Sequence, residues 1–268
     1  MKVAVLITSF NRKQNTLRCL ESLFQSKKAA NLEVFLLDDA STDGTPEAIQ
    51  AQFPQVHLLH GDGKFFWGGG TRLAWVAAEP SNPDAFILLN DDVQLDADAL
   101  ERVFEWNEKL GGQALLGCAM RSAITGESTY GGNRRHGLHP MKYVRLEPDS
   151  KEALEADVLN ANLLLVPGDV YKKVGIFPTY LVQQGGDFDY SLRARKAGFK
   201  AMLLPGTYGI CETNPPGVRK RGMAGLRKIL GPKELPIRYT VPFYREHCGL
   251  LWPIWWVIPY VRAFIVGF

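Results

Sequence analysis

The stretch VFLLDDASTDGTP, residues 34–46, passes from a short apolar run into a polar turn and then into Pro46. An apolar run of this length bounded by turn residues is typical of a strand in a parallel sheet that is covered on both faces. Asp, Ser, Thr and Gly favour a turn with side-chain to backbone hydrogen bonds, and Pro fits the first turn of a helix. The stretch therefore predicts a strand, a turn and the start of a helix.

The same alternation of strand and helix continues to about residue 110. Apolar runs at 3–7, 34–37, 56–59, 86–89 and 201–204 predict strands. Apolar side chains at three-to-four-residue spacing predict helices after the first and fourth of these runs. We therefore expect an α/β fold with a mostly parallel sheet flanked by helices, in which ligands bind outside the carboxyl ends of the strands.

Composition limits the class of protein. The 268 residues, 46% of them hydrophobic, suffice for one substantial core, and the net charge of +3 gives no argument for nucleic acid binding. The N-terminal residues are better interpreted as a buried strand than as a signal peptide. The cysteines are far apart, which predicts neither a zinc site nor disulfides and fits a reducing cytosol; they are Cys19, Cys118, Cys211 and Cys248.

Two acidic clusters end predicted strands. Asp38 and Asp39 form the first, and Asn90, Asp91 and Asp92 form the second. Each alone is explained by a turn, but adjacent carboxylates disfavour joint ionisation unless donors or a cation satisfy them. Carboxylate oxygens suit Mg²⁺ or Mn²⁺, which also bind phosphate oxygens. Together at one sheet edge, the clusters predict a site for a nucleotide and a metal.

Five segments give the chain a resemblance to a known family. They are TSFNR (8–12), LLDDASTDGT (36–45), FFWGGGTRLAW (65–75), LLNDDV (88–93) and GGDFDYSLRARKAGFK (185–200). With these segments, which are spread over most of residues 1–214, the chain resembles inverting family 2 glycosyltransferases with the GT-A fold. It is similar to bacterial rhamnosyltransferase-like enzymes of surface polysaccharide assembly.

The resemblance implies roles for individual residues. Asp92 is the expected metal ligand, joined by Asp91 and by Glu212 as a third ligand where a His is more usual, with Mg²⁺ or Mn²⁺ as the cofactor. Asp39 is expected to face the base. The residues expected to bind the nucleotide or donor are Thr8, Ser9, Asn11, Asp38, Asp39, Trp67, Gly69, Arg72 and Asp91.

Asp187 is the expected catalytic base. It precedes a predicted helix in a segment that resembles the family's Glu-Asp-x-Asp signature, with Gly186 where an acid usually stands and Asp189 as the expected helix cap. The resemblance implies an inverting hexosyltransferase that moves a sugar from a dTDP- or UDP-sugar to a hydroxyl of a glycan or polyprenyl-linked acceptor. Rhamnose is a first candidate for the sugar, and glucose and galactose stay open.

Two other functions compete with glycosyl transfer. The run Gly68-Gly69-Gly70-Thr71-Arg72 resembles the phosphate loop of sugar nucleotidyltransferases, but in that family the loop follows the first strand. Here the glycines are expected to let backbone approach the donor, or to form a tight turn. A non-catalytic nucleotide- or glycan-binding protein is the third alternative.

The end of the chain differs in composition from the rest. We predict a glycosyltransferase domain over 1–215 and a helical region over 216–268. The helical region either binds a membrane surface or packs on protein, which is its own domain or another subunit of a homo-oligomer. Basic residues are followed by an apolar, Trp-rich stretch that Pro253, Pro259 and Arg262 interrupt, which favours attachment over spanning. We expect the protein on the cytoplasmic face of the cell membrane. The basic residues are Arg219, Lys220, Arg221, Arg227, Lys228, Lys233 and Arg238.

Overall fold

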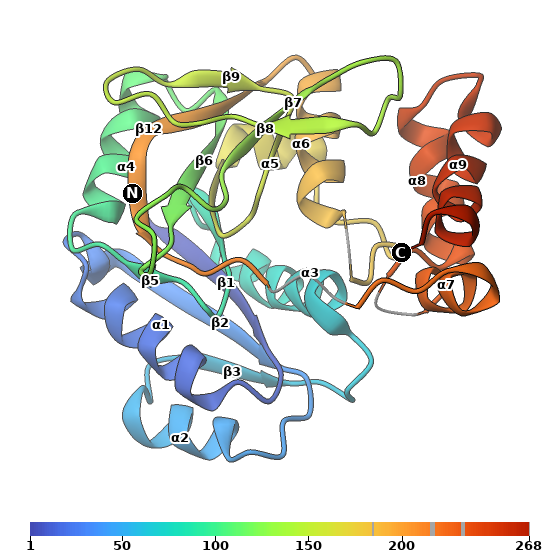
Figure 1. Ribbon diagram of the computed structural model, residues 1–268. Helices are drawn as coiled ribbons and strands as arrows, with labels where there is room; N and C mark the ends of the chain where they lie inside the picture. Colours follow the sequence, from blue (N-terminus) through green and yellow to red (C-terminus); the bar gives the residue numbers. More distant parts are fainter. Residues whose placement is uncertain (184, 215–217, 232–233, 268) are drawn as a thin grey trace.

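The computed structural model describes residues 1–183, 185–214, 218–231 and 234–267 (Figure 1). The strands are β1 (Val3–Ser9), β2 (Leu32–Asp38), β3 (His57–His60), β4 (Ala85–Leu89), β5 (Gln94–Leu95), β6 (Ala114–Arg121), β7 (Gly132–Arg135), β8 (Tyr143–Arg145), β9 (Leu154–Ala156), β10 (Val158–Leu159), β11 (Leu163–Pro167) and β12 (Lys200–Ile210). The helices are α1 (Lys13–Gln25), α2 (Thr45–Gln52), α3 (Phe66–Ala78), α4 (Ala99–Lys109), α5 (Gly168–Val174), α6 (Gly186–Lys196), α7 (Gly222–Ile229), α8 (Ile237–His247) and α9 (Trp252–Ile265), with 3-10 turns η1 (Ala29–Asn31) and η2 (Glu79–Ser81).

The main sheet has the strand order β3-β2-β1-β4-β11-β6-β12-β5, with β9 paired to β12. The first four strands in this order are parallel, whereas β11 runs antiparallel to both β4 and β6. Parallel pairing returns between β6 and β12. The predicted α/β fold and all five predicted strands are confirmed, and parallel pairing is strongest in the N-terminal half, where strands and helices alternate.

Strand β1 is apolar from Val3 to Ile7 because both of its faces are covered. Alternate residues belong to two separate cores, since successive side chains of a strand point to opposite faces. Val3, Val5 and Ile7 pack in one core with Cys19, Leu20 and Leu23 of α1, and Ala4 and Leu6 pack in the other with Ala74, Trp75 and Ala78 of α3. The continuous apolar run is thus a consequence of helices on both sides of the sheet (Figure 1).

The parallel strands bring the predicted site segments to one edge. Ser9 at the end of β1 lies opposite Asp38 at the end of β2, and β4 lies on the other side of β1. The acidic cluster at Asn90 follows β4 directly. The ends of β2, β1 and β4 are therefore neighbours, as expected from the sequence.

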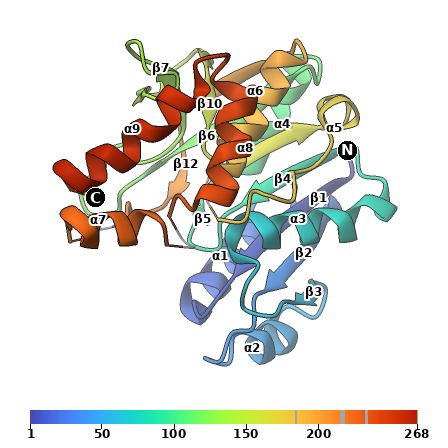
Figure 2. The same cartoon turned by 90° about the vertical axis from the view of Figure 1, so that its right-hand side faces the viewer.

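A group of helices at the end of the chain stands on one side of the main sheet (Figure 2). Its small core contains Ile229, Tyr260 and Ala263. Within the described residues, no helix is both long and apolar enough to cross a bilayer. The predicted domain boundary at 215–216 and the predicted basic residue Lys233 lie outside the described residues.

Candidate active site

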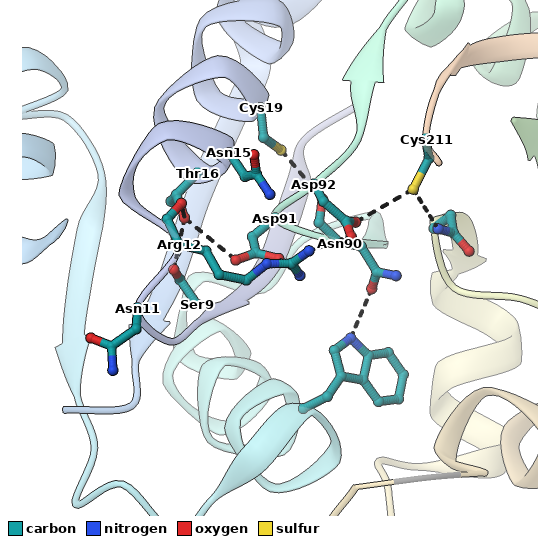
Figure 3. Close-up of polar contacts among 12 residues, drawn as sticks. Ser9, Asn11, Arg12, Asn15, Thr16, Cys19, Asn90, Asp91, Asp92 and Cys211 are labelled. Atoms are coloured by element: carbon teal, nitrogen blue, oxygen red, sulfur yellow. Dashed lines mark hydrogen bonds and ion pairs between the residues drawn. The ribbon is translucent and has the colours of Figure 1, made fainter. Parts of the chain in front are cut away.

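The carboxylates of Asp91 and Asp92 are both bound by Arg12, which follows β1 (Figure 3). One guanidinium nitrogen of Arg12 donates to Asp91 Oδ1 at 2.9 Å, and the other donates to Asp92 Oδ2 at 2.8 Å. Asp91 is only 4% exposed. Because two adjacent carboxylates are costly to bury without a cation, Arg12 supplies part of the charge that they require.

Burial raises the pKa of Asp91 to about 6, and Asp92 acts in the same direction, while Arg12 opposes the shift. Hydroxyl groups complete the surroundings of this carboxylate. The Thr16 hydroxyl lies 3.4 Å from Asp91 Oδ2 and 2.7 Å from the Ser9 hydroxyl. Ser9 is therefore connected to the acidic pair through the Thr16 hydroxyl.

The first acidic cluster orders the loops around it. Both oxygens of Asp39 accept backbone hydrogen bonds, from Gly63 at 2.8 Å and from Phe66 at 2.9 Å. Asp38 accepts from the Ser41 backbone at 2.9 Å, and its other oxygen is buried without a hydrogen-bond partner among the described residues. Asp39 thus fixes the chain that leads into α3, and Asp38 keeps an unused acceptor.

Asn11 belongs to the same turn. Its side-chain oxygen accepts from the Thr42 backbone at 2.8 Å, and its backbone donates to the Ser41 hydroxyl at 2.8 Å. In Figure 3 the Asn11 side chain points away from Asp91 and Asp92. The structure therefore joins Asn11 to the turn after β2 and does not bring it to the second cluster.

The glycine run lies in the first turns of α3 and is no phosphate loop after the first strand. A Cβ on Gly70 would lie 2.4 Å from Thr8 Cγ2, and a Cβ on Gly68 would lie 2.8 Å from the Leu181 carbonyl oxygen. Thr8 itself contacts Thr71 through their hydroxyls, 3.2 Å apart. These glycines permit close packing of α3 against β1 and against the segment before α6.

Trp67 connects this helix to the second cluster, because its indole N–H donates to Asn90 Oδ1 at 2.8 Å. Gly69 donates its backbone N–H to the Val182 carbonyl at 3.0 Å. Arg72 is half-buried in α3 and does not line the cleft described below.

Asp187 lies in the first turn of α6. Its Oδ1 accepts from the Phe188 backbone at 2.9 Å, and Asn160 Nδ2 lies 3.5 Å from its Oδ2. Burial raises the pKa of Asp187 to about 6, against the opposing effect of hydrogen bonds from the Phe188 and Ala161 backbone and from Asn160. A carboxylate with this pKa is a stronger base than an exposed Asp and is still ionised at neutral pH.

Asp189 does not cap α6, contrary to expectation. The N-cap residue is Gly185, with φ of +80°, a conformation that glycine adopts readily. The Asp189 carboxylate is fully buried and binds Arg193 at 2.7 Å and His247 of α8 at 2.8 Å. It therefore anchors the C-terminal helices to the helix that carries Asp187.

A cleft of about 730 Å³ gathers part of the predicted site. Of the predicted residues, four line it: Trp67, Asp91, Asp92 and Asp187. The remaining predicted residues are not among its lining: Thr8, Ser9, Asn11, Asp38, Asp39, Gly69, Arg72 and Glu212. The cleft thus brings the two acidic residues that follow β4 together with the acid of α6, although about 95 residues separate them in sequence.

The donor set fits a hard divalent cation only in part. Asp91 and Asp92 supply carboxylate oxygens, and Mg²⁺ typically needs one or two carboxylates besides water and substrate phosphates. Both oxygens of Glu212 are engaged elsewhere, by the Ser122 hydroxyl at 2.7 Å and the Ala123 backbone at 2.6 Å. Accordingly, the described residues contain no group of three metal-ligating side chains.

Sequence reasoning missed three residues around the site. Arg12 stands in the quoted TSFNR segment, but nothing local indicates that it pairs with carboxylates some 80 residues away. The Cys211 thiol donates to Asp92 Oδ1 at 3.5 Å, one position before the predicted Glu212. His247 had no motif around it, and only the contact with Asp189 shows its place.

Comparison with known proteins identifies the family. The family model described as "Glycosyl transferase family 2" matches residues 4–157, more than half of the chain. The N-acetylglucosaminyl-diphospho-decaprenol L-rhamnosyltransferase of Mycobacterium tuberculosis is 26% identical over 202 residues, which are 65% of this chain and 64% of the relative. The alignment thus spans less than two thirds of that relative's length.

Solved structures of glycosyltransferases share the fold. A mannosyltransferase from Pyrobaculum calidifontis, in complex with GDP-Man and Mn²⁺, gives a TM-score of 0.59 at 14% identity, covering 98% of this chain and 74% of that one. S. aureus TarS residues 1–349, in complex with UDP-GlcNAc, also gives 0.59 at 14% identity, covering 98% and 81%. The α/β fold is therefore a GT-A fold, and with the family model matched across the strands that build the site, the chain belongs to glycosyl transferase family 2.

Proposed function

We propose that this glycosyltransferase moves a sugar from a nucleoside diphosphate sugar to a hydroxyl of a glycan or lipid-linked glycan, with inversion at the anomeric carbon. The observation that carries the proposal is the common cleft of Asp187, Asp91 and Asp92. Asp187, a base with a pKa of about 6, lies in the same cleft as a carboxylate pair suited to a divalent cation that binds the diphosphate of the donor.

The chemistry assigned to Asp187 is general base catalysis. Its carboxylate accepts the proton of the acceptor hydroxyl while that oxygen forms a bond to the anomeric carbon. The bond from the anomeric carbon to the diphosphate oxygen breaks on the opposite face, so the configuration inverts and the nucleoside diphosphate leaves with the bonding electrons. The Phe188 backbone N–H and Asn160 hold the carboxylate in place.

Asp91 and Asp92 would hold a divalent cation, which neutralises charge on the leaving diphosphate. Mg²⁺ and Mn²⁺ are the proposed ions. Glu212 as a third ligand stays a prediction, and it would have to give up its hydrogen bonds to Ser122 and Ala123.

The nucleotide is assigned to the turns after β1 and β2. Asp39 holds the wall of this region through its bonds to residues 63–66, and the unpartnered oxygen of Asp38 is an acceptor for a nucleotide donor group. We propose a dTDP- or UDP-sugar, and dTDP-rhamnose is the first donor to test because the mycobacterial relative is named a rhamnosyltransferase.

Thermal unfolding with nucleotides tests the donor and metal assignments together. UDP or dTDP at about 100 times its Kd should stabilise the fold by about 2.7 kcal/mol. We expect this gain to require Mn²⁺ or Mg²⁺ and to disappear in Asp92→Asn, but to persist in Asp169→Asn, an exposed acid of α5. Release of pyrophosphate from a nucleoside triphosphate and a sugar phosphate would instead identify a nucleotidyltransferase.

The stereochemical assignment needs a separate measurement. The product formed from dTDP-rhamnose or a UDP-hexose should have the anomeric configuration opposite to that of the donor, which NMR of the glycoside reports. A product with retained configuration would contradict the role of Asp187 as a base.

We also propose that α9 attaches the protein to the cytoplasmic face of an anionic membrane. Apolar side chains at helical spacing are exposed along it, and Arg219, Lys220 and Arg221 are exposed beside it, which suits acidic headgroups. The exposed apolar residues of α9 are Ile254, Val257, Ile258, Val261, Phe264 and Ile265, and Leu250 and Leu251 are exposed just before the helix.

Sedimentation with phosphatidylglycerol vesicles tests the membrane attachment. The double change Ile254→Glu and Phe264→Glu should abolish it. The change Ile124→Glu, at an exposed apolar residue of the loop after β6, should leave it intact. Equal sedimentation of both variants would contradict attachment through α9.

A further inference from the structure

A second cavity of about 1030 Å³ borders the cleft that Asp187 lines. Its described lining residues come from the loop at 139–142, from Asn214 and Arg219 after β12, and from the helices α7, α8 and α9. Figure 2 shows these three helices grouped at the end of the chain. The His139 ring packs against Trp255 of α9 with centroids 5.3 Å apart. A Cβ on Gly225 of α7 would lie 2.5 Å from the Ala263 carbonyl oxygen of α9. Packing between distant segments therefore holds the cavity walls in place.

The cavity has an excess of positive charge. Lys142, Arg219, Lys228 and Arg262 line it, against a single acid, Glu234, among the described lining residues. Within the described chain, no ion pair joins Lys142, Arg219 or Arg262 to a carboxylate. Guanidinium groups bind phosphate oxygens in bidentate geometry. The lining thus matches an anion with more than one negative charge.

The cavity and the cleft are neighbours that share part of their lining. Met141, Asn214, Glu234 and Tyr244 line both of them. A ligand whose charged group lies among the arginines can therefore extend a neutral part toward Asp187. The lining also includes the apolar residues Ile258 and Pro259 of α9, and Ile258 is one of the exposed apolar side chains of that helix.

We propose that this cavity binds the diphosphate of an amphiphilic acceptor, with the acceptor sugar toward Asp187 and the hydrocarbon chain along α9. The inference rests on the proposed function, since it assigns the second substrate of the same reaction. Arg219 and Arg262 are the residues that recognise the diphosphate. The metal-binding carboxylates of the donor site lie in the cleft, so the two diphosphates have separate places.

Binding of farnesyl diphosphate, measured by calorimetry on the full chain, tests this assignment without any turnover. Arg219→Gln and Arg262→Gln should each weaken binding about tenfold or more, the loss expected for one charge-assisted hydrogen bond. Arg227→Gln removes the same charge from an exposed position of α7 that does not line the cavity, and it should change the affinity less than about twofold.

Two further measurements test which kind of diphosphate the cavity binds and whether the variants remain folded. Saturating UDP with Mn²⁺ should leave farnesyl diphosphate binding unchanged, and farnesol should bind far more weakly. UDP affinity should be equal in all variants, which shows that the donor cleft is intact.

The proposal is overturned if Arg219→Gln and Arg262→Gln bind farnesyl diphosphate like Arg227→Gln, or if UDP displaces it competitively. It is also overturned if farnesol binds as tightly. Loss of transfer in Asp187→Asn with farnesyl diphosphate binding retained would support both proposals. Intact farnesyl diphosphate binding in a protein that transfers no sugar would contradict only the proposed function.

Discussion

Replacing Asp187 by Asn removes the proposed base while keeping the size of the side chain. A positioned general base contributes about 10²–10⁴ in rate. Since each factor of ten is about 1.36 kcal/mol of barrier, the change should raise the barrier by roughly 3–5 kcal/mol. Wild-type kcat/KM should fall as the pH drops through the Asp187 pKa of about 6, because the base becomes protonated. The residual activity of the variant should depend less steeply on pH in this range, because of Asp187 and Asp91 only Asp91 then remains to titrate near pH 6.

The same substitution should stabilise the fold at neutral pH. The pKa of Asp187 rises from 3.8 to about 6 on folding, so the folded state favours the protonated acid. Stability from this group is complete below its unfolded pKa and is lost as the pH rises through about 6. The shift corresponds to at most about 3 kcal/mol, and because the residue is half-buried we expect a gain of about 1–2 kcal/mol in Asp187→Asn.

Urea unfolding of both proteins at about pH 4.5 and about pH 7.5 measures this difference. The variant should exceed the wild type at the higher pH and approach it at the lower one. Asp91 titrates in both proteins alike, so its contribution cancels. Asp169→Asn, an exposed acid, should change neither rate nor stability appreciably. Transfer by Asp187→Asn within tenfold of the wild type, or lower stability than the wild type at about pH 7.5, would refute the reasoning.

Urea unfolding also tests three other contacts. Arg12→Gln should cost about 2 kcal/mol, because two adjacent carboxylates lose their cation. Mn²⁺ should stabilise Arg12→Gln more than it stabilises the wild type. Equal stabilisation of the two proteins would count against a metal at Asp91 and Asp92. Gly70→Ala should cost about 1–3 kcal/mol, because its Cβ would lie 2.4 Å from Thr8 Cγ2. A Cβ on Gly69 meets no close contact, so Gly69→Ala should gain up to about 1 kcal/mol of stability. A stabilising Gly70→Ala or a destabilising Gly69→Ala would contradict the packing role. His247→Ala leaves a buried carboxylate short of a partner and should cost about 2 kcal/mol. Amide exchange should then rise in α6 and α8 together, and exchange confined to α8 would argue against their coupling.

The fold could be predicted from the sequence because its signals are local. The apolar runs at 3–7, 34–37 and 86–89 became β1, β2 and β4, since a strand covered on both faces needs apolar side chains at every position. Parallel strands end at the same edge, so the convergence of Ser9, Asp38 and Asn90 also followed from the pattern. The resemblance to the family was confirmed over residues 4–157.

The contacts of the site could not be predicted in the same way. Asp39 is predicted to face the base, and the sequence did not indicate that its two oxygens bind the backbone of Gly63 and Phe66. Asp189 was expected to cap its helix, and it pairs with His247, 58 residues later. The glycine run was expected to let backbone approach the donor or to form a tight turn, and the sequence did not indicate that Gly68 and Gly70 are sites of close packing. In each case the residue type indicated hydrogen bonding or small size, but its partner is distant in sequence.

By itself, the sequence determined the alternation of strands and helices, the edge of the sheet at which the acidic clusters lie, and the family. These follow from periodicity and turn chemistry over a few residues. Only the tertiary structure decided that Arg12 neutralises Asp91 and Asp92, and that a basic cavity opens between residues 139–142 and the C-terminal helices. Such pairings depend on how separate elements pack. A buried carboxylate needs a donor or a cation beside it, and tertiary packing decides which residue supplies it.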